Sequence, residues 1–214
     1  MRCININQDQ LNVLMSPEAY IPTQEELFDH QIGTLLHKGI VKNPGQFKDL
    51  RRSILSERLF LLVPQTNFSI SKLMSFIELD GKKGFSGLNE SHLKDVIKTP
   101  KRHYIATNIK DGREMFNIFS LEALEELSQK KRSGWTVREG IFYVIYFPFV
   151  LKNHSIDLVG SRYESGGVPS LYLVGDGPKL HWHCPGLASS SWSVASCGSR
   201  VWRGYHKRPR QTRR

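Results

Sequence analysis

The sequence predicts an α+β fold, with N-terminal helices and a mixed or antiparallel sheet that ends in a C-terminal β-meander. Helical segments with capping residues recur between residues 22 and 147, whereas residues 155–201 are β-rich and broken by glycine and proline. A hydrophobic content of 39% in 214 residues is enough to build a full core without disulfides. We therefore expect a loose N-terminal arm (1–21), a single α+β domain (22–201) and a basic disordered tail (202–214).

The first helices are predicted from capping signals and apolar spacing. "PTQEELFDHQIGTLLHKG" begins with Thr23 and Glu26, which fit a capping box, and ends at Gly39, a common C-terminal stop. A second helix is expected after Pro44, through "GQFKDLRRSILSER".

Two more helices follow in the second half of the predicted domain. "SLEALEELSQKK" begins at Ser120, with glutamates in its first turns and lysines at its end. "TVREGIFYVIYF" opens with Thr136 and Glu139 as another capping box and ends before Pro148, despite its β-prone residues.

Strands are predicted between and after these helices. "LFLLVP" (59–64) is typical of a short buried strand, and "SISKLMSFIEL" of a helix that ends in an extended segment. "HYIATNIKDGREMFNI" (103–118) alternates around Asp111-Gly112 and predicts a hairpin. "GKKGFSG" lacks the phosphate-loop spacing and is interpreted as a hairpin loop. The meander is predicted from "SIDLVGSRY", "SLYLVGDGPKLHWHC" and "SWSVASCGSRVW".

The net charge of +10 is concentrated at the C-terminal end. Six arginines and one lysine lie in residues 200–214, and without them 23 basic residues face 20 acidic ones. The longest apolar run, "IFYVIYFPFVL", has 11 residues, well short of the roughly 20 of a membrane-spanning helix. Three cysteines and no apolar leader indicate a cytoplasmic protein without a disulfide framework.

Reactive chemistry is considered at two places. His181 and His183 lie two apart on a predicted strand and share a face, which is half of a zinc or iron site. Their spacing matches no established metal motif, so a structural role within the sheet is the alternative. Cys197 in "ASCGSR" is a candidate nucleophile, with Arg200 to lower its pKa and His183 as base; burial as a small apolar residue is the alternative.

Two binding surfaces are also predicted. The first is a pocket for an anionic ligand, with cations on adjacent meander strands and an aromatic wall, formed by Arg162, Lys179, Trp182 and His183. Surface pairing of these cations with acidic neighbours is the alternative. The second is the basic tail, whose cations and aromatic residues suit nonspecific nucleic-acid contact, through Arg203, Lys207, Arg208, Arg210, Arg213 and Arg214.

The chain also resembles an uncharacterised bacterial family of unknown function over residues 25–201. The resemblance rests on "LFDHQIGTLLHKG", "GFSGLN", "TPKRHYIATNIKDGREMFNIFSLEAL" and the stretch from "TVREGIFYV" to "SVASCGSR". The matching positions near the C-terminus are Gly160, Ser161, Arg162, Pro169, Pro178, Lys179, Trp182, Gly186, Ser196 and Cys197. It implies a compact intracellular domain with no established activity.

Three functions follow from these features. The first is a non-enzymatic binding or interaction module for a small anionic ligand or a protein partner, with no membrane contact. The second is an enzyme that depends on Cys197 or on a metal at His181 and His183. The third is a nucleic-acid-associated protein that acts through its tail.

Overall fold

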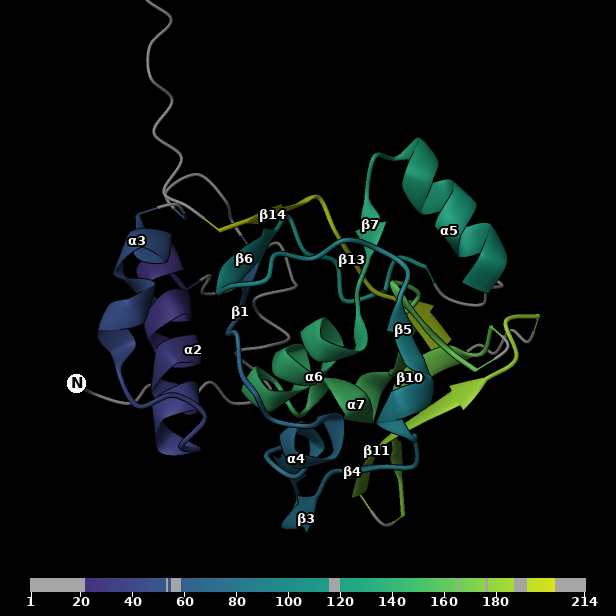
Figure 1. The fold of residues 1–214 in the computed structure, drawn as a ribbon, viewed down its shortest axis with the longest axis horizontal. Coiled ribbons are helices and arrows are strands. Elements are labelled where there is room, and N and C mark those ends of the chain that lie inside the picture. Colours follow the sequence, from purple (N-terminus) through teal and green to yellow (C-terminus); the bar gives the residue numbers. More distant parts are fainter. Residues whose placement is uncertain are drawn as a thin grey trace, which may run out of the picture.

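A computed structural model describes residues 22–52, 54, 59–115, 120–164, 166–175, 177–186 and 192–202. The predicted N-terminal arm and the tail from residue 203 onward lie outside the described residues. Helices and several antiparallel or mixed sheets alternate along the chain, which confirms the α+β class (Figure 1).

Helix α6 (Val137–Tyr146) runs through the middle of the molecule (Figure 1). Every residue of α6 except Arg138 is buried, as expected for a helix that is apolar on most sides. Its predicted capping box is confirmed, because the Thr136 side chain accepts from the Glu139 backbone and the Glu139 carboxylate accepts from Thr136. Gly140 lets the helix pack closely against Leu158, since a Cβ at position 140 would lie 2.3 Å from the Leu158 side chain.

A three-stranded antiparallel sheet packs on one side of α6. Its order is β1 (Phe60–Val63), β6 (Tyr104–Thr107) and β14 (Ser199–Val201), so the chain's last described strand joins two earlier ones. All residues of β1 and β6 are buried, which confirms the predicted strand at 59–64. The side-chain amide of the fully buried Gln31 donates to Phe60 O at 3.2 Å and accepts from Leu62 N at 2.7 Å. These bonds satisfy backbone groups on the outer edge of β1.

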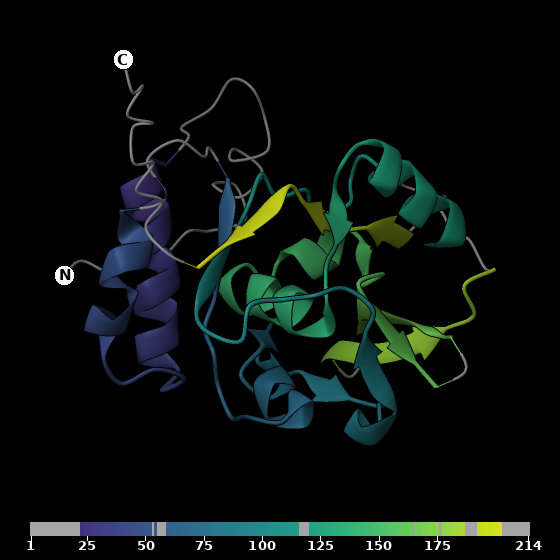
Figure 2. The same ribbon diagram turned by 45° about the horizontal axis from the view of Figure 1, so that its top comes forward.

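The helix that carries Gln31 is α2 (Gln24–His37), and its capping box is confirmed. Gly39 has a φ of +67°, the left-handed conformation expected just after a helix. After Pro44 the chain forms a 3₁₀ turn (Pro44–Phe47) and a single turn of α3 (Lys48–Arg51), so only part of the second predicted helix is helical among the described residues. Residues 53 and 55–58 of that prediction lie outside the described residues. Helices α2 and α3 lie side by side (Figures 1 and 2).

A five-stranded mixed sheet forms the other half of the core, in the order β12-β8-β10-β11-β4. The predicted meander is confirmed for its three antiparallel strands, β8 (Ser155–Asp157), β10 (Val168–Val174) and β11 (Gly177–His183). The two edges are parallel pairings, of β4 (Phe85–Ser86) with β11 and of β12 (Trp192–Val194) with β8.

The meander does not continue beyond these strands. The buried Ala195 and Cys197 carry the chain into the core, where β13 (Ser196–Cys197) pairs with β7 (Ser133–Gly134). The chain then reaches the other sheet as β14. The prediction of one C-terminal meander is therefore wrong for its last segment, because β12 pairs in parallel with β8, whereas β13 and β14 pair with strands of two other sheets.

Smaller elements complete the described fold. Helix α4 (Ile70–Met74) precedes the hairpin of β2 (Glu78–Leu79) and β3 (Lys82–Lys83), as predicted. Helix α5 (Ser120–Gln129) lies across the molecule from α2 and α3 (Figure 2). The remaining elements are the 3₁₀ turn Glu90–His92, β5 (Leu93–Asp95), α7 (Val150–Asn153) and β9 (Ser161–Tyr163), which pairs with β5.

The hairpin predicted at 103–118 is wrong in the part that is described. Its first strand is β6, but the partners of β6 are β1 and β14. The Asp111 carboxylate is buried and accepts a bond from Arg113 Nε at 2.9 Å, and Met115, the last described residue of this segment, is buried as well. Residues 116–119, the end of the predicted second strand, lie outside the described residues. In the described part of the chain, no helix has the length and apolar character needed to cross a membrane.

Candidate functional site

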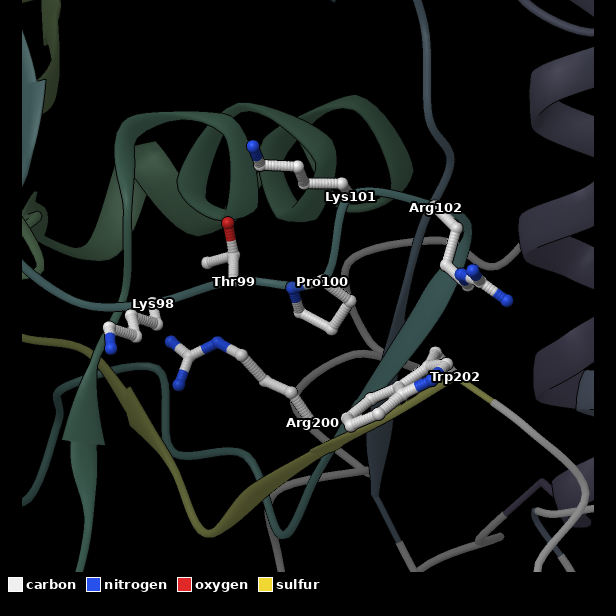
Figure 3. Close-up of a pocket in the computed structure, with 7 residues that line it drawn as sticks. All are labelled: Lys98, Thr99, Pro100, Lys101, Arg102, Arg200 and Trp202. Carbon is white, nitrogen blue, oxygen red and sulfur yellow. The ribbon is translucent and has the colours of Figure 1, made fainter.

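A basic pocket lies where the loop between β5 and β6 passes over the end of β14 (Figure 3). Its volume is about 470 Å³, within the range of small-molecule sites. Four cations and no carboxylate line it. The lining residues are Lys98, Thr99, Pro100, Lys101, Arg102, Arg200 and Trp202.

The loop and the strand contribute different properties to this pocket. Lys98, Lys101 and Arg102 are exposed, and none of them forms an ion pair with another described residue. Trp202 follows β14 directly and is 48% exposed. The pocket therefore offers three uncompensated charges and an open aromatic surface to the solvent.

Arg200 is fixed at the base of the pocket by a buried carboxylate. Its Nε and Nη2 donate to Glu139 at 2.7 and 2.9 Å, and Nη2 also donates to the Gly134 carbonyl at 3.0 Å. The Glu139 side chain is fully buried, and that of Arg200 is 9% exposed. Burial opposes the charge of Arg200, but the hydrogen bonds and charge of Glu139 outweigh burial and raise the pKa of Arg200.

The Glu139 carboxylate also accepts hydrogen bonds from donors other than Arg200. Tyr104 Oη donates to it at 2.9 Å, and the Thr136 backbone N–H donates at 2.8 Å. Burial, followed by the charge of Glu139, raises the pKa of the Tyr104 hydroxyl well above its usual value. The capping residue of α6 thus serves a second purpose, because it orients the arginine that lines the pocket.

A second hollow of about 50 Å³ adjoins the pocket and shares Thr99 and Pro100 with it. Thr66 lines this hollow, and its buried Oγ1 has no hydrogen-bond partner among the described residues. Tyr104 and Thr136, two donors to Glu139, line it as well. The hollow is large enough for a water molecule that would satisfy Thr66.

The anion pocket predicted on the meander is not assembled as expected. Arg162 lies on β9 and Lys179 on β11, which belong to different sheets, so the expectation of adjacent strands is wrong. Arg162 Nη1 donates to the Val159 and Ser161 carbonyls, both at 2.8 Å, and burial lowers its pKa. Lys179 Nζ lies 5.5 Å from the centre of the Phe85 ring.

Trp182 and His183 are engaged within the fold in the same way. The Trp182 ring stacks on Tyr163 with centroids 5.7 Å apart. His183 Nε2 lies 3.0 Å from Asp157 Oδ1, and its Nδ1 lies 3.0 Å from the Cys184 carbonyl. Burial works against a charged His183, but the bonds to Asp157 prevail and raise the pKa of the imidazole.

The predicted metal ligands lie two apart on β11, as expected. His181 Nδ1 is 3.0 Å from the Trp182 carbonyl. Across the ranges that the structure describes, no three His, Cys, Asp or Glu side chains gather into a possible metal site. Zinc or iron at His181 and His183 remains a prediction.

The predicted nucleophile, Cys197, is fully buried on β13. Burial and then the charge of Glu139 raise the pKa of its thiol to about 12, and this outweighs the opposite effect of Arg200. His183, the predicted base, lies on a strand of another sheet. The geometry favours the alternative of a packed apolar cysteine. The predicted nucleic-acid residues from Arg203 to Arg214 lie outside the described residues.

The motifs in the sequence do not predict the loop of the pocket as a site. A signal was present, because "KTPKRH" places three charged cations in six residues without an acid, directly before a buried strand. The sequence predicts Arg200 as a neighbour of Cys197 and as one of the cations of residues 200–214, but not as part of a pocket. Its partner Glu139 lies 61 residues away, a separation that sequence patterns do not reveal.

The fold and the pocket together define an α+β protein with a basic surface site built on a buried ion pair. The chain belongs to a family of unknown function (DUF5701), whose sequence model matches residues 24–201. This confirms the predicted resemblance to a family of unknown function, while the bacterial origin remains a prediction. No curated protein matches this chain. No solved structure matches it either. The matched region includes the loop cations and Arg200 and ends one residue before Trp202.

Proposed function

We propose that this protein is a non-enzymatic binding module whose basic pocket holds a phosphate-bearing ligand. The observation that carries the proposal is a pocket of about 470 Å³ lined by Lys98, Lys101, Arg102 and Arg200 without any carboxylate. Guanidinium and ammonium groups form charge-assisted hydrogen bonds to phosphate oxygens, and clustering of one sign of charge in a cleft raises the local concentration of anions.

The role of Arg200 in this proposal follows from its attachment to Glu139. The carboxylate engages Nε and Nη2 of the guanidinium, whereas Nη1 has no hydrogen-bond partner among the described residues. Glu139 offsets the charge of Arg200, so the attraction for an anion comes mainly from the three loop cations. The fixed guanidinium contributes orientation, because it needs little further ordering on binding.

The test is isothermal titration calorimetry, which measures the affinity of the full chain for inorganic tripolyphosphate. We expect binding by the unmodified chain and at least tenfold weaker binding by the Lys98→Glu/Arg102→Glu variant, since each lost charged hydrogen bond is worth about 1.5 kcal/mol or more. The control is Lys42→Glu/Lys83→Glu, which makes the same change in net charge at exposed lysines outside the pocket lining.

The control distinguishes a site from general attraction. An affinity within about twofold of the unmodified chain is expected for the control, because distant surface charges are screened. Equal weakening by both double variants would show that tripolyphosphate follows net charge alone. That outcome, or the absence of any binding, would contradict the proposal.

A further inference from the structure

We infer that the phosphate-bearing ligand is a single-stranded nucleic acid, with one base stacked on Trp202 and its neighbouring phosphates held by the loop cations. This inference rests on the proposed function and specifies its ligand. The shared chemistry of phosphate is not enough to choose a ligand class, so the choice depends on the aromatic surface.

Trp202 is the feature that a simple phosphate site does not need. It is 48% exposed, whereas Trp135 is fully buried in the core. An indole that stays exposed to water forgoes the favourable free energy of burying its apolar surface. In single-strand binding proteins, unpaired bases stack on exposed aromatic rings that lie among cations.

The cations flank this indole on both sides. In Figure 3 the Arg200 guanidinium and Lys98 lie on one side of the Trp202 ring, and Arg102 lies on the other. A nucleotide within a strand has a phosphate on each side of its base. The order of cation, indole and cation along the pocket therefore matches the order of phosphate, base and phosphate.

The sequence extends the same pattern past the pocket. The residues after Trp202 include Arg203, Tyr205 and Lys207, so cations and an aromatic residue follow directly in the chain. This alternation of cations with an aromatic residue in the sequence suits a strand, whose phosphates and bases also alternate.

A single-stranded ligand is favoured over a duplex because stacking on an indole requires an unpaired base. The decisive experiment compares two fluorescent oligomers with the same number of phosphates. One is an oligodeoxythymidylate of about ten nucleotides, and the other has the same backbone with abasic residues. Their affinities for the full chain are measured by fluorescence anisotropy at a fixed salt concentration.

We expect the unmodified chain to bind the thymidylate about tenfold more tightly than the abasic oligomer, the effect of stacking one base. Trp202→Leu removes the indole but keeps an apolar side chain, and it is expected to abolish this preference without changing the affinity for the abasic oligomer. The control Phe85→Leu removes another exposed aromatic ring, 38% exposed and outside the pocket, and should keep the preference.

Three outcomes would overturn the inference. The first is equal affinity of the unmodified chain for both oligomers. The second is a Trp202→Leu variant that weakens both oligomers equally, which would give the indole a structural role. The third is a duplex of the same sequence that binds as tightly as the single strand. In each case the tripolyphosphate titration decides separately whether the proposed function still stands.

Discussion

Two groups of basic side chains in this molecule differ in what surrounds each charge. On β9 and β11, Arg162 donates to two backbone carbonyls, Lys179 lies over Phe85, and His183 is paired with Asp157. In the loop between β5 and β6, Lys98 and Arg102 have no such partner among the described residues.

This difference explains why one group is a candidate site and the other is part of the framework. A cation that already has its hydrogen bonds within the fold must break them before it binds an anion, and that cost reduces its affinity. A cation that faces only solvent has no such cost. The number of basic residues in a segment is therefore a weaker indicator of a site than the partners of each residue.

The largest expected effect concerns Cys197, which lies in neither group and would be the centre of a thiol enzyme. Its pKa of about 12, against 9.0 for an unperturbed thiol, makes the thiolate about a thousandfold scarcer near neutral pH. In a Cys3→Ser background we expect a disulfide reagent to label the exposed Cys184 readily and Cys197 about a thousandfold more slowly. Labelling of Cys197 at the rate of Cys184 would restore the enzyme hypothesis.

The next effect concerns the ion pair beneath the pocket. Glu139→Gln leaves the Arg200 guanidinium buried without its counter-charge, so we expect the free energy of unfolding to fall by about 3 kcal/mol. Urea unfolding followed by circular dichroism measures this change. The matched control is Asp29→Asn, which removes the half-exposed partner of Arg51 and is expected to cost at most about 1 kcal/mol.

Similar losses in the two variants would mean that Glu139 does not brace the pocket. The structural interpretation of Arg200 would then be wrong, and its place in the pocket would have to be explained by the backbone of β14 alone.

Local features of this fold were predictable from the sequence. The capping boxes of Thr23 and Thr136 begin the helices as expected, because each depends on residues only three positions apart. The β10–β11 hairpin was predictable for the same reason, since its turn chemistry lies within the segment itself.

Features that depend on distant contacts were not predictable. Nothing in the local pattern of residues 199–201 indicates that they pair with β6 instead of β12. The pocket depends on this pairing, because it brings Arg200 and Trp202 to the loop between β5 and β6. The density of charge in the tail predicts a nucleic-acid contact there, but density does not show which cations have partners.

A smaller effect is expected at His183, in the group that is engaged within the fold. Its pKa is raised in the folded protein, so the pair with Asp157 stabilises the fold fully below about pH 6.5 and loses this contribution as the pH rises through the folded pKa. We expect His183→Gln to lower the free energy of unfolding by about 1.5 kcal/mol at pH 6, and by less at pH 8.

The comparison must be made as a difference between the variant and the unmodified chain at each pH. Burial lowers the pKa values of His103 and His154, so these residues give the opposite trend in both proteins and cancel in the difference. A difference that is independent of pH would show that His183 is neutral when folded, which would make it available as a metal ligand again.

The smallest expected effect is the sharpest test of the comparison between the two groups. Lys179→Glu and Lys98→Glu make the same change in net charge, one in each group. We expect Lys98→Glu to weaken the binding of tripolyphosphate about fivefold and Lys179→Glu to change it by less than about twofold, because Lys179 is engaged with Phe85 and lies outside the pocket lining. The reverse order would place the anion site on β11, where the meander was first predicted to hold it, and would show that a cation over an aromatic ring remains available to a ligand.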